Sequence, residues 1–469
     1  MTIRQDQSPL HFTAMRRVVP AGLTYGRDNR ENAIVTGLVM LMTLLGGGPA
    51  TVPTPRFVAA VLAAIMAGVL LASVRNRRPL PFRFADGLVA GLVVLIIAQL
   101  VPLPASLWTA LPGRALTMDI DMAVFGRLGW RPLSVDPSLT AETATQLLPA
   151  LAAYIAVRTG PAARLVAVID GVLIAGGLGL LLGALQMLFQ GAAVLSPYSR
   201  GDYLVPTGFF TNHNHQAVFL ECLFPLALIR TRLAPWTRRR LPADLKTVLG
   251  VSATGVLACV VLATGSRMGT ALLVPLTITS WIALRGASKI GFLRAVTFTG
   301  GIAMLVALGG TRLVASLQKG DLASDQRWDF FRDAWQANLS YWPAGAGLGT
   351  FSIAFAPLEP LAHLGPHYLN HVHNDYLELA FEAGAAGMLL AGVGIIWFLS
   401  RMTIAYRDKA ATDMQMLHRM ACIPVLLLLL HSIFDYPLRT LASEIVMATS
   451  IALLSINYPP HFFKLHLKK

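Results

Sequence analysis

The segment HVHNDYLELAFEAGAAG, residues 371–387, holds the residues best suited to chemistry. It passes from polar residues into a hydrophobic run, so His373 would lie at the mouth of a membrane helix, where a titratable group is costly unless it has a use. Asp375 and Glu378 have the spacing of a capping box, which predicts that a helix begins here. An imidazole just ahead of that helix is favoured as the neutral base, because the helix N-terminus carries partial positive charge. His373 could then accept a hydroxyl proton or hold a phosphate oxygen, unless the motif only starts a helix.

Three arginines are candidates for binding an anion. Arg267 lies in TGSRMG, and Arg327 and Arg332 lie in the segment SDQRWDFFRDAWQANLS. The planar guanidinium suits a phosphate better than an ammonium group does, and two arginines from separate loops could clamp one anion. The alternatives are that Arg267 extends to lipid head groups and that the other two pair with Asp329 or Asp333.

Histidines and asparagines gather in two stretches of loop. Their two H-x-H pairs match no closed zinc module, and no cysteine assists them. Polar contacts to a hydroxyl-rich ligand are therefore the favoured interpretation, and no metal site is predicted. These residues are Asn212, His213, Asn214, His215, His363, His367, His371 and His373.

Two other segments have residues that could form a site. The glycine-rich AGAGLGTF (344–351) follows no strand and precedes no Lys-Ser/Thr pair, so it predicts a tight turn and no nucleotide cofactor. In the short loop Asp435-Tyr436-Pro437-Leu438-Arg439, the Asp–Arg pair is either a structural ion pair or part of a site.

The elements that carry these residues are predicted to be membrane helices. Of 469 residues, 55% are hydrophobic and only 13% are charged, about half the charged fraction of soluble proteins. The apolar residues fall into about twelve runs of the length that crosses a bilayer. The fold class is thus all-α and polytopic. The runs are centred near Leu41, Ala64, Val94, Ala150, Gly177, Leu223, Leu257, Thr277, Ala303, Gly394, Leu427 and Ala448.

The distribution of basic residues gives the predicted orientation. With the N-terminus in the cytoplasm and the spans alternating, 27 of the 38 Lys and Arg residues fall on the cytoplasmic side. This is the positive-inside pattern, and it places both termini in the cytoplasm. The net charge of +14 therefore indicates topology and contact with anionic membrane lipids rather than nucleic-acid binding.

The chain is interpreted as one membrane domain, 1–469, interrupted by outward-facing loops. The loops are 102–141, ending where Thr140 or Glu142 starts the next helix, then 190–215, and a large loop at 311–384. The large loop holds an amphipathic helix capped by Ser324 or Asp325. Its aromatic face is suited to lying on a membrane surface; that face consists of Trp328, Phe331 and Trp335.

Several motifs together resemble one membrane family. His373-Asn374, nine residues, then Gly384-x-x-Gly387 resembles the signature of O-antigen ligases. TGFFTNHNHQA (207–217) is similar to a motif of the wider ligase and polymerase family, and TGSRMG to its Ser-Arg-x-Gly turn. The resemblance covers roughly residues 200–440.

This resemblance implies a GT-C-like glycosyltransferase of the bacterial inner membrane, working on the periplasmic face without metal or cofactor. The donor would be a glycan on undecaprenyl diphosphate. Arg267 and Arg327 would grip the diphosphate, and His373 would activate the acceptor hydroxyl. No enzymic nucleophile is evident, so direct attack with inversion is expected. The remaining candidate substrate contacts are Asn212, Asn214, His215, Asn374 and Asp375.

The resemblance leaves the acceptor open. Ligases move polymer onto lipid A–core, polymerases join repeat units as O-antigen or exopolysaccharide, and protein-directed members glycosylate pilin-like acceptors. One rival interpretation is a transporter or flippase of lipid-linked glycan, which predicts charges near the bilayer midplane; only Asp170, Glu221 and Glu444 come near spans. Another is a non-catalytic scaffold of an export complex, in which His373 and Arg267 would be replaceable.

Overall fold

The computed structural model describes residues 25–48, 52–74, 81–189, 193–195, 198, 205–233, 243–284, 327–363, 369–407 and 412–457. Within these residues the chain is helical, as predicted, except for one short antiparallel pairing. That pairing joins β1 (Pro102–Leu103) to β2 (Arg131–Pro132).

Each predicted span centre except Ala303, which lies outside the described residues, falls in an α-helix. By length and composition, Pro53–Ser73, Ala162–Leu188, Asp375–Arg407 and Met414–His431 could cross a membrane; Phe84–Leu100, Ser252–Ala263 and Leu441–Ser455 are shorter apolar helices. This architecture is consistent with a membrane protein, and the count of twelve spans stays a prediction. The helices are α1 (Tyr25–Leu45), α2 (Pro53–Val74), α3 (Phe84–Leu100), α7 (Leu148–Thr159), α8 (Ala162–Leu188), α9 (His213–Leu233), α10 (Ala243–Ala263), α11 (Arg267–Leu284), α15 (Asp375–Arg407), α16 (Asp413–His431) and α17 (Leu441–Ser455).

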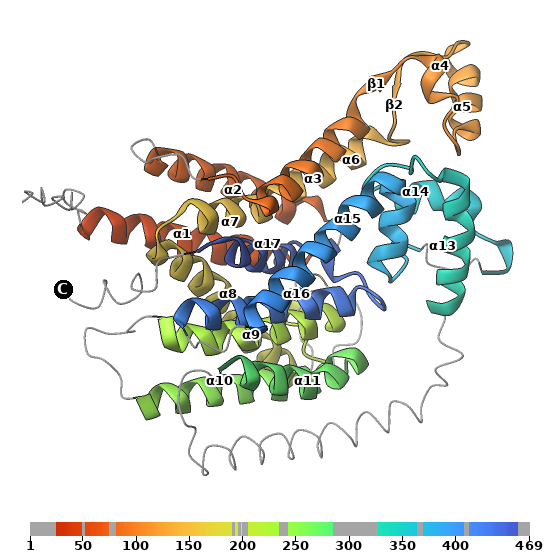
Figure 1. Ribbon diagram of the computed structural model, residues 1–469. Coiled ribbons are helices and arrows are strands. Elements are labelled where there is room, and N and C mark those ends of the chain that lie inside the picture. The colour runs from red at the N-terminus through yellow and green to blue at the C-terminus, as the bar shows by residue number, and fades with distance from the viewer. Residues whose placement is uncertain are drawn as a thin grey trace, which may run out of the picture.

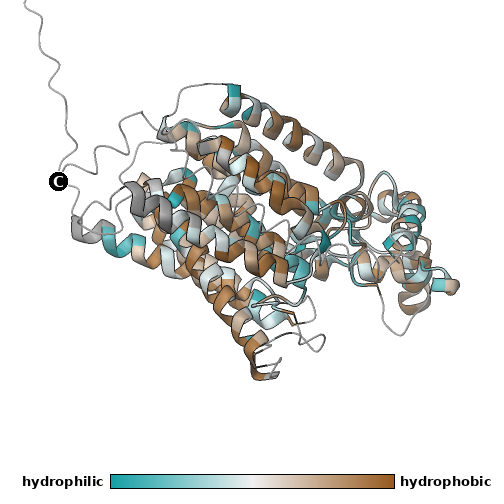
Figure 2. Ribbon diagram, turned by 90° about the horizontal axis from the view of Figure 1, so that it is seen from below, coloured by the Kyte–Doolittle hydropathy of each residue, from teal (hydrophilic) through white to brown (hydrophobic). Residues whose placement is uncertain are grey.

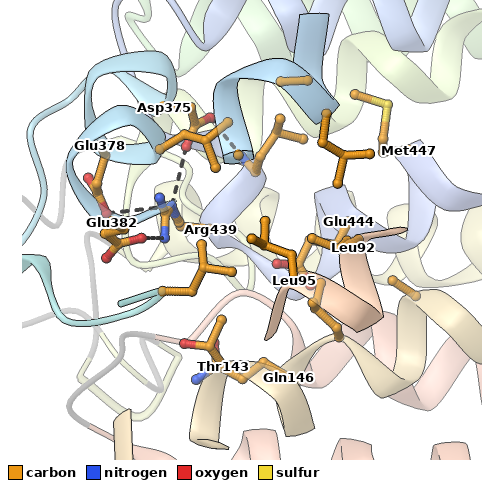
Figure 3. Close-up of a pocket in the computed structure, with 18 of the residues that line it drawn as sticks. Leu92, Leu95, Thr143, Gln146, Asp375, Glu378, Glu382, Arg439, Glu444 and Met447 are labelled. Carbon is orange, nitrogen blue, oxygen red and sulfur yellow. Dashed lines mark hydrogen bonds and ion pairs between the residues drawn. The ribbon is translucent and has the colours of Figure 1, made fainter. Parts of the chain in front are cut away.

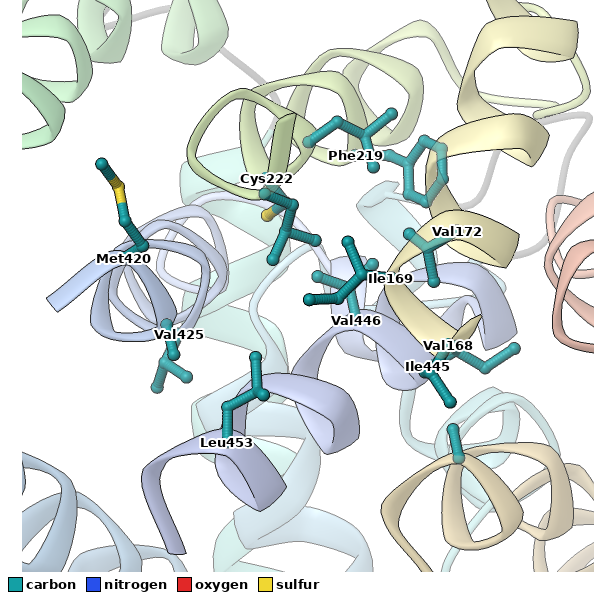
Figure 4. Close-up of a cluster of buried hydrophobic side chains, with 14 of the residues drawn as sticks. Val168, Ile169, Val172, Phe219, Cys222, Met420, Val425, Ile445, Val446 and Leu453 are labelled. Carbon is teal, nitrogen blue, oxygen red and sulfur yellow. The ribbon is translucent and has the colours of Figure 1, made fainter. Parts of the chain in front are cut away.

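The long helices pack side by side into a bundle (Figure 1). Helix α8 packs along α1, α17 packs along α7, and α9 contacts both α10 and α16. The centre of the bundle is built from branched aliphatic side chains and an aromatic ring, with Cys222 among them (Figure 4). Because these side chains come from α8, α9, α16 and α17, residues far apart in sequence share one core.

Two of the three acidic residues near the spans have an arginine or histidine partner on a neighbouring helix. Arg230 of α9 binds Asp170 of α8, with Nε 2.5 Å from Oδ1 and Nη2 3.0 Å from Oδ2. Glu221 of α9 binds His431 of α16, with 2.8 Å between Oε2 and Nε2. Each pair joins two neighbouring helices. Contacts between helices therefore explain why Asp170 and Glu221 lie in spans.

A cap of short elements covers one end of the bundle, and polar residues gather there (Figure 2). Helix α6 begins at Pro137, because the Asp136 carboxylate caps it by accepting hydrogen bonds from Ser138 N and Leu139 N. The predicted start at Thr140 or Glu142 is therefore wrong. The cap consists of β1, β2, α4 (Ala105–Trp108), α5 (Ala115–Phe125), α6 (Pro137–Gln146), α13 (Arg327–Tyr341), α14 (Phe351–Phe355), η3 (Ala356–Leu358) and η4 (Leu361–His363). Two further short turns are η1 (Ala193–Leu195) and η5 (Pro437–Arg439).

The predicted amphipathic helix is present as α13, although its expected caps lie outside the described residues. Trp328 and Trp335 are exposed, at 49% and 56%. Phe331 is instead partly buried, and it packs against a hydrophobic cluster that contains Ala334, Tyr341 and Phe381. The exposed face is thus narrower than the predicted one.

Candidate functional site

The start of α15 is set by Asn374. Its Oδ1 accepts hydrogen bonds from Tyr376 N and Leu377 N, both at 3.0 Å, which satisfies the first amides of the helix. Glu378 does not form the predicted capping box, because its carboxylate accepts from Val372 N at 3.0 Å and contacts His371 Nδ1 at 2.8 Å. The helix therefore begins where predicted, but through a different residue.

His373 directly precedes this cap in a left-handed backbone conformation, with φ +59°. Among the described residues it is the one non-glycine residue with positive φ, which costs about 1–3 kcal/mol where the surroundings impose it. The backbone on either side is held, since Val372 N binds Glu378 and Asn374 Nδ2 donates to Ile433 O at 2.9 Å. These contacts hold the left-handed backbone and thereby set the direction in which the His373 side chain leaves the chain.

Five residues form what we call the histidine cluster: His215, His371, His373, Asp435 and Tyr436. The Asp435 Oδ1 lies 3.3 Å from His373 Nδ1 and 3.5 Å from His215 Nε2. The Tyr436 ring meets all three imidazoles, with centroid distances of 4.6 Å to His215, 4.3 Å to His371 and 4.9 Å to His373. Two segments distant in sequence, one with His215 and one with His371 and His373, thus meet at the short loop that carries Asp435 and Tyr436.

The charge state of Asp435 follows from its neighbours. Burial alone would raise the pKa of this carboxyl, but His215 and His373 lower it well below its ordinary value. Burial and the nearby Asp435 raise the pKa of the Tyr436 phenol, which keeps it neutral. An ionised carboxylate only accepts hydrogen bonds, so His373 Nδ1 donates to Asp435 and its Nε2 is left as the proton acceptor.

Beside the histidine cluster lies a carboxylate cluster, made of Arg439, Asp375, Glu378 and Glu382 (Figure 3). Arg439 Nη1 donates to Glu382 Oε2 at 2.6 Å, and Nε lies 3.6 Å from Asp375 Oδ1 and 3.5 Å from Glu378 Oε1. Burial would lower the pKa of Arg439, but the three carboxylates raise it above its ordinary value. Arg439 therefore does not pair with Asp435, which was the partner considered from sequence.

The two signature glycines are required by the backbone. Gly384 has φ +58° and ψ −151° and divides α15 into 375–383 and 385–407, so the predicted loop end at 384 coincides with this kink. A Cβ at Gly384 would lie 2.1 Å from Pro343 O, and one at Gly387 would lie 2.3 Å from Ala383 Cβ. The turn 343–347 enters the kink, where Ala385 N donates to Pro343 O at 2.9 Å and Gly347 N donates to Glu382 O at 2.8 Å.

Arg327 begins a helix that contacts the histidine cluster, and Arg267 begins a helix that packs on α9 near His215. Arg327 begins α13, and Phe330, one turn later, stacks on the His373 ring with 6.4 Å between centroids. Arg267 begins α11, where a Cβ on Gly269 would lie 3.0 Å from Ala217 Cβ in the first turns of α9. That packing brings the turn of Arg267 beside the helix start that carries His215.

The other predicted substrate contacts lie at the same helix starts. Asn212 Oδ1 accepts from Asn214 N at 2.8 Å and so caps α9. Asp375 is buried and accepts from Ser432 Oγ at 2.7 Å and Leu438 N at 3.2 Å. These observed bonds of Asn212, Asn374 and Asp375 are to the protein itself, and their contact with substrate, like that of Asn214, stays a prediction.

Of the other histidines in the predicted set, His213 begins α9 and His363 lies in the cap. His363 Nδ1 contacts Asp333, a pairing that the sequence did not predict. Arg332 lies 3.7 Å from Asp329, which is one of the pairings predicted as an alternative to anion binding. His367 lies outside the described residues. Across the described parts of the chain, no group of three metal-binding side chains is placed to hold an ion.

Tyr436, Glu382 and the partners of Arg439 were missed by sequence reasoning. The available signal was weak: a polar DYPLR segment after an apolar run, and acidic residues at 375, 378 and 382 with spacings of three and four. Such spacing places side chains on one helix face, but it does not say which distant residue they meet.

Comparison with known families agrees with the motifs. A family model described as O-antigen ligase matches residues 253–392. Over these residues the chain is similar to O-antigen ligases. The O-antigen ligase region runs from α10 into α15 and contains Arg267, Arg327, His373, Gly384 and Gly387. It supports a role as a ligase or polymerase of surface polysaccharide, with glycosyltransferase-like activity in an integral membrane protein.

The O-antigen ligase region covers less than a third of the chain. Both Asp435 and His215 lie outside it, so the histidine cluster combines residues from within and beyond the match. No curated protein matches the chain.

Proposed function

We propose that this protein transfers a glycan from an undecaprenyl-diphosphate carrier to a hydroxyl acceptor at the periplasmic face of the bacterial inner membrane, as a GT-C-like enzyme. The observation that carries the proposal is the contact between His373 and Asp435 inside a cluster reached by the O-antigen ligase region. A base held by an ionised carboxylate, with candidate anion-binding arginines on adjoining helix starts, suits transfer from a phosphate leaving group.

The proposed step is a direct displacement. The Nε2 of His373 takes the proton of the acceptor hydroxyl, and that oxygen forms a bond to the anomeric carbon. The bond between this carbon and the diphosphate oxygen breaks, and the diphosphate leaves with the electron pair. Arg267 and Arg327 stabilise its charge. One displacement inverts the anomeric centre.

The role of Asp435 in this step is to keep the imidazole in one tautomer. While Nδ1 donates to Asp435 Oδ1, Nε2 has a lone pair directed away from that contact. After transfer, the imidazolium is stabilised by the same carboxylate. Tyr436 packs against the ring and limits its rotation.

The proposal is tested by replacing His373 with Ala in a strain that lacks the chromosomal copy. We expect undecaprenyl-diphosphate glycan to accumulate and the transferred glycan to disappear, while the variant still inserts in the membrane. The matched control is His363→Ala, since His363 belongs to the cap and contacts Asp333. Normal consumption of the carrier-linked glycan by His373→Ala would overturn the proposed site.

The accumulated species also identifies the acceptor class. Long carrier-linked polymer with none on lipid A–core would indicate a ligase, and single carrier-linked repeat units would indicate a polymerase. Loss of glycan from a protein alone would indicate a protein-directed transferase.

A further inference from the structure

Residues 102–132, which contain β1, α4, α5 and β2, form a lobe of the cap that projects beyond the end of α3 (Figure 1). Helix α5 carries an apolar stripe on this lobe, because Leu116, Ile120 and Val124 recur at every fourth position and so lie on one side of the helix. Their exposed fractions are 52%, 49% and 66%. Contiguous exposed apolar surface of this kind marks a contact with a membrane or with another protein.

The apolar surface extends past both ends of α5. Leu107 of α4, Phe125 at the last position of α5 and Trp130 just before β2 are all exposed, and Trp130 is the most exposed of the three, at 70%. Tryptophan is enriched where a membrane meets water, because its ring is apolar and its indole N–H is polar.

The lobe offers little charge beside this apolar surface. Of its five charged residues, Arg114 is buried, and Arg131 Nε donates to Asp121 Oδ2 at 2.6 Å. The other two, Asp119 and Arg127, are exposed and have opposite signs. The lobe therefore has no net positive face that would select anionic lipids.

The level of the lobe relative to a bilayer follows from α3. That helix has charge at its start, with Arg83 at the N-cap and Asp86 in the first turn. Its 17 residues rise about 25 Å, whereas the hydrocarbon core of a bilayer is about 30 Å thick. With Arg83 at one boundary of the hydrocarbon, Leu100 at the other end of α3 lies just inside the opposite boundary. The lobe begins two residues after Leu100, so it starts at that opposite boundary.

The lobe also continues an apolar stripe of α3. Val94 and Ile97 of α3 and Val101 at its C-cap are exposed at helical spacing, and in a membrane protein such a stripe faces lipid. Along the chain, the next large apolar side chain that is exposed is Leu107 in the lobe. A protein partner covering the lobe would have to reach in among lipid head groups, whereas the bilayer is already beside Val101.

We infer that the lobe is a membrane anchor for the cap, which dips into the bilayer leaflet on the cap side. The stripe of Leu116, Ile120 and Val124 lies among the upper parts of the acyl chains, and Trp130 lies at the level of the head groups. Apolar faces of interfacial helices are buried in this way by about 5–10 Å.

The anchor is tied to the turn that enters the kink of α15. Arg114 Nη2 donates to Leu133 O at 2.6 Å and to Gly345 O at 2.9 Å, and the guanidinium lies 5.5 Å from the centroid of the Tyr341 ring. Gly345 belongs to the turn 343–347, which is hydrogen-bonded to α15 on both sides of Gly384. The depth of the lobe therefore sets the level of this turn relative to the membrane surface.

The test measures the depth of single nitroxide labels in the full-length protein, without its three native cysteines, in phosphatidylcholine nanodiscs. Collisions of the label with O2, which concentrates in the bilayer, are compared with collisions with a water-soluble nickel chelate. The label is placed by Val124→Cys. The matched control is Asp119→Cys, an exposed position well round the same helix from Val124, and Ile97→Cys gives the value for a side chain that faces lipid.

We expect the ratio of O2 to nickel collisions at position 124 to exceed the ratio at position 119 roughly fivefold and to approach that at position 97. Adding phosphatidylglycerol should leave the ratios unchanged, because the lobe has no net positive face. Equal ratios at 119 and 124 would overturn the inference. A label at 124 that collides with neither reagent would also overturn it, since a second copy or another protein would then cover the stripe. So would a difference that appears only with phosphatidylglycerol.

This anchor is independent of the proposed function, because its test uses no substrate. The variant His373→Ala should give the same collision ratios as the parent while glycan transfer is lost. Loss of the depth difference with normal dependence of transfer on His373 would reject the anchor alone, and the opposite result would reject the transferase alone.

Discussion

At the scale of residues, one carboxylate organises the histidine cluster. Asp435 contacts both His373 and His215, and the next residue, Tyr436, packs against both rings. The left-handed backbone of His373 shows that the imidazole is held where local backbone preference would not place it. Such strain persists only when the surrounding contacts over-determine it.

Replacing Asp435 with Asn should slow glycan transfer by at least about a hundredfold, because the amide can also donate to Nδ1 and so favour the wrong tautomer. The initial rate of glycan transfer by Asp435→Asn in proteoliposomes, compared with that of the wild type, measures the effect. The pKa of Asp435 is well below its ordinary value. The carboxylate therefore stays charged at neutral pH, and it becomes protonated only in strong acid. Between pH 6 and pH 8, roughly, the defect should therefore not depend on titration of Asp435.

The control for that variant is Asp119→Asn, on an exposed part of α5. Its transfer rate should equal that of the wild type. An Asp435→Asn enzyme of normal rate would show that His373 needs no carboxylate partner.

Replacing Arg439 with Met should reduce the free energy of unfolding by about 3–5 kcal/mol, because Asp375, Glu378 and Glu382 would be left as buried charges without their shared partner. Unfolding in detergent micelles measures the loss. Arg332→Met is the matched control, since its side chain is 68% exposed and its pair with Asp329 spans 3.7 Å. That control should cost less than about 0.5 kcal/mol; a similar cost for both variants would contradict the role given to Arg439.

At the scale of elements, the kink in α15 joins the membrane bundle to the cap. The turn 343–347 from the cap lies in the gap that Gly384 opens, and Gln99 of α3 holds both sides, donating to Glu382 O at 3.0 Å and accepting from Leu348 N at 2.9 Å. The kink thereby sets the direction of 375–383, the helical segment that carries the three acids of the carboxylate cluster.

Gly384→Ala should destabilise the protein by at least about 2 kcal/mol, because the backbone region is one that only glycine favours and the Cβ would clash with Pro343 O. Gly392→Ala, in open space on the same helix, should instead be neutral or stabilise by up to about 1 kcal/mol. The free energy of unfolding of both variants, measured by chemical denaturation in detergent, tests this prediction. If Gly384→Ala were tolerated, the signature glycine would have no backbone role.

At the scale of the whole molecule, the histidine cluster lies at the start of α15, at the end of the bundle that carries the cap (Figure 1). Helix α15 begins beside the histidine cluster and ends at Arg407, so the two ends of this helix lie on opposite sides of the membrane if it spans. The orientation of α15 in the membrane decides which compartment supplies the substrates that reach the histidine cluster.

In a background without Cys222, Cys259 and Cys422, a membrane-impermeant maleimide added to spheroplasts should label Arg332→Cys but not Arg407→Cys. Both positions are exposed, so access to the reagent is not limited by burial. Labelling of the 407 position alone would invert the topology and place His373 in the cytoplasm.

The sequence by itself determined the helical class, the positions of the apolar helices in the described residues, the start of α15 and the arginines and histidine of the O-antigen ligase region. These features are local, because apolar run length and cap or turn residues act within a few positions. Tertiary structure alone decided that Asp435 meets His373 and His215, that Arg439 gathers three carboxylates and that Gly384 admits a distant turn. The side-chain partners are separated by 57 to 220 residues. Such pairings depend on how the helices pack, and neither spacing nor periodicity encodes that.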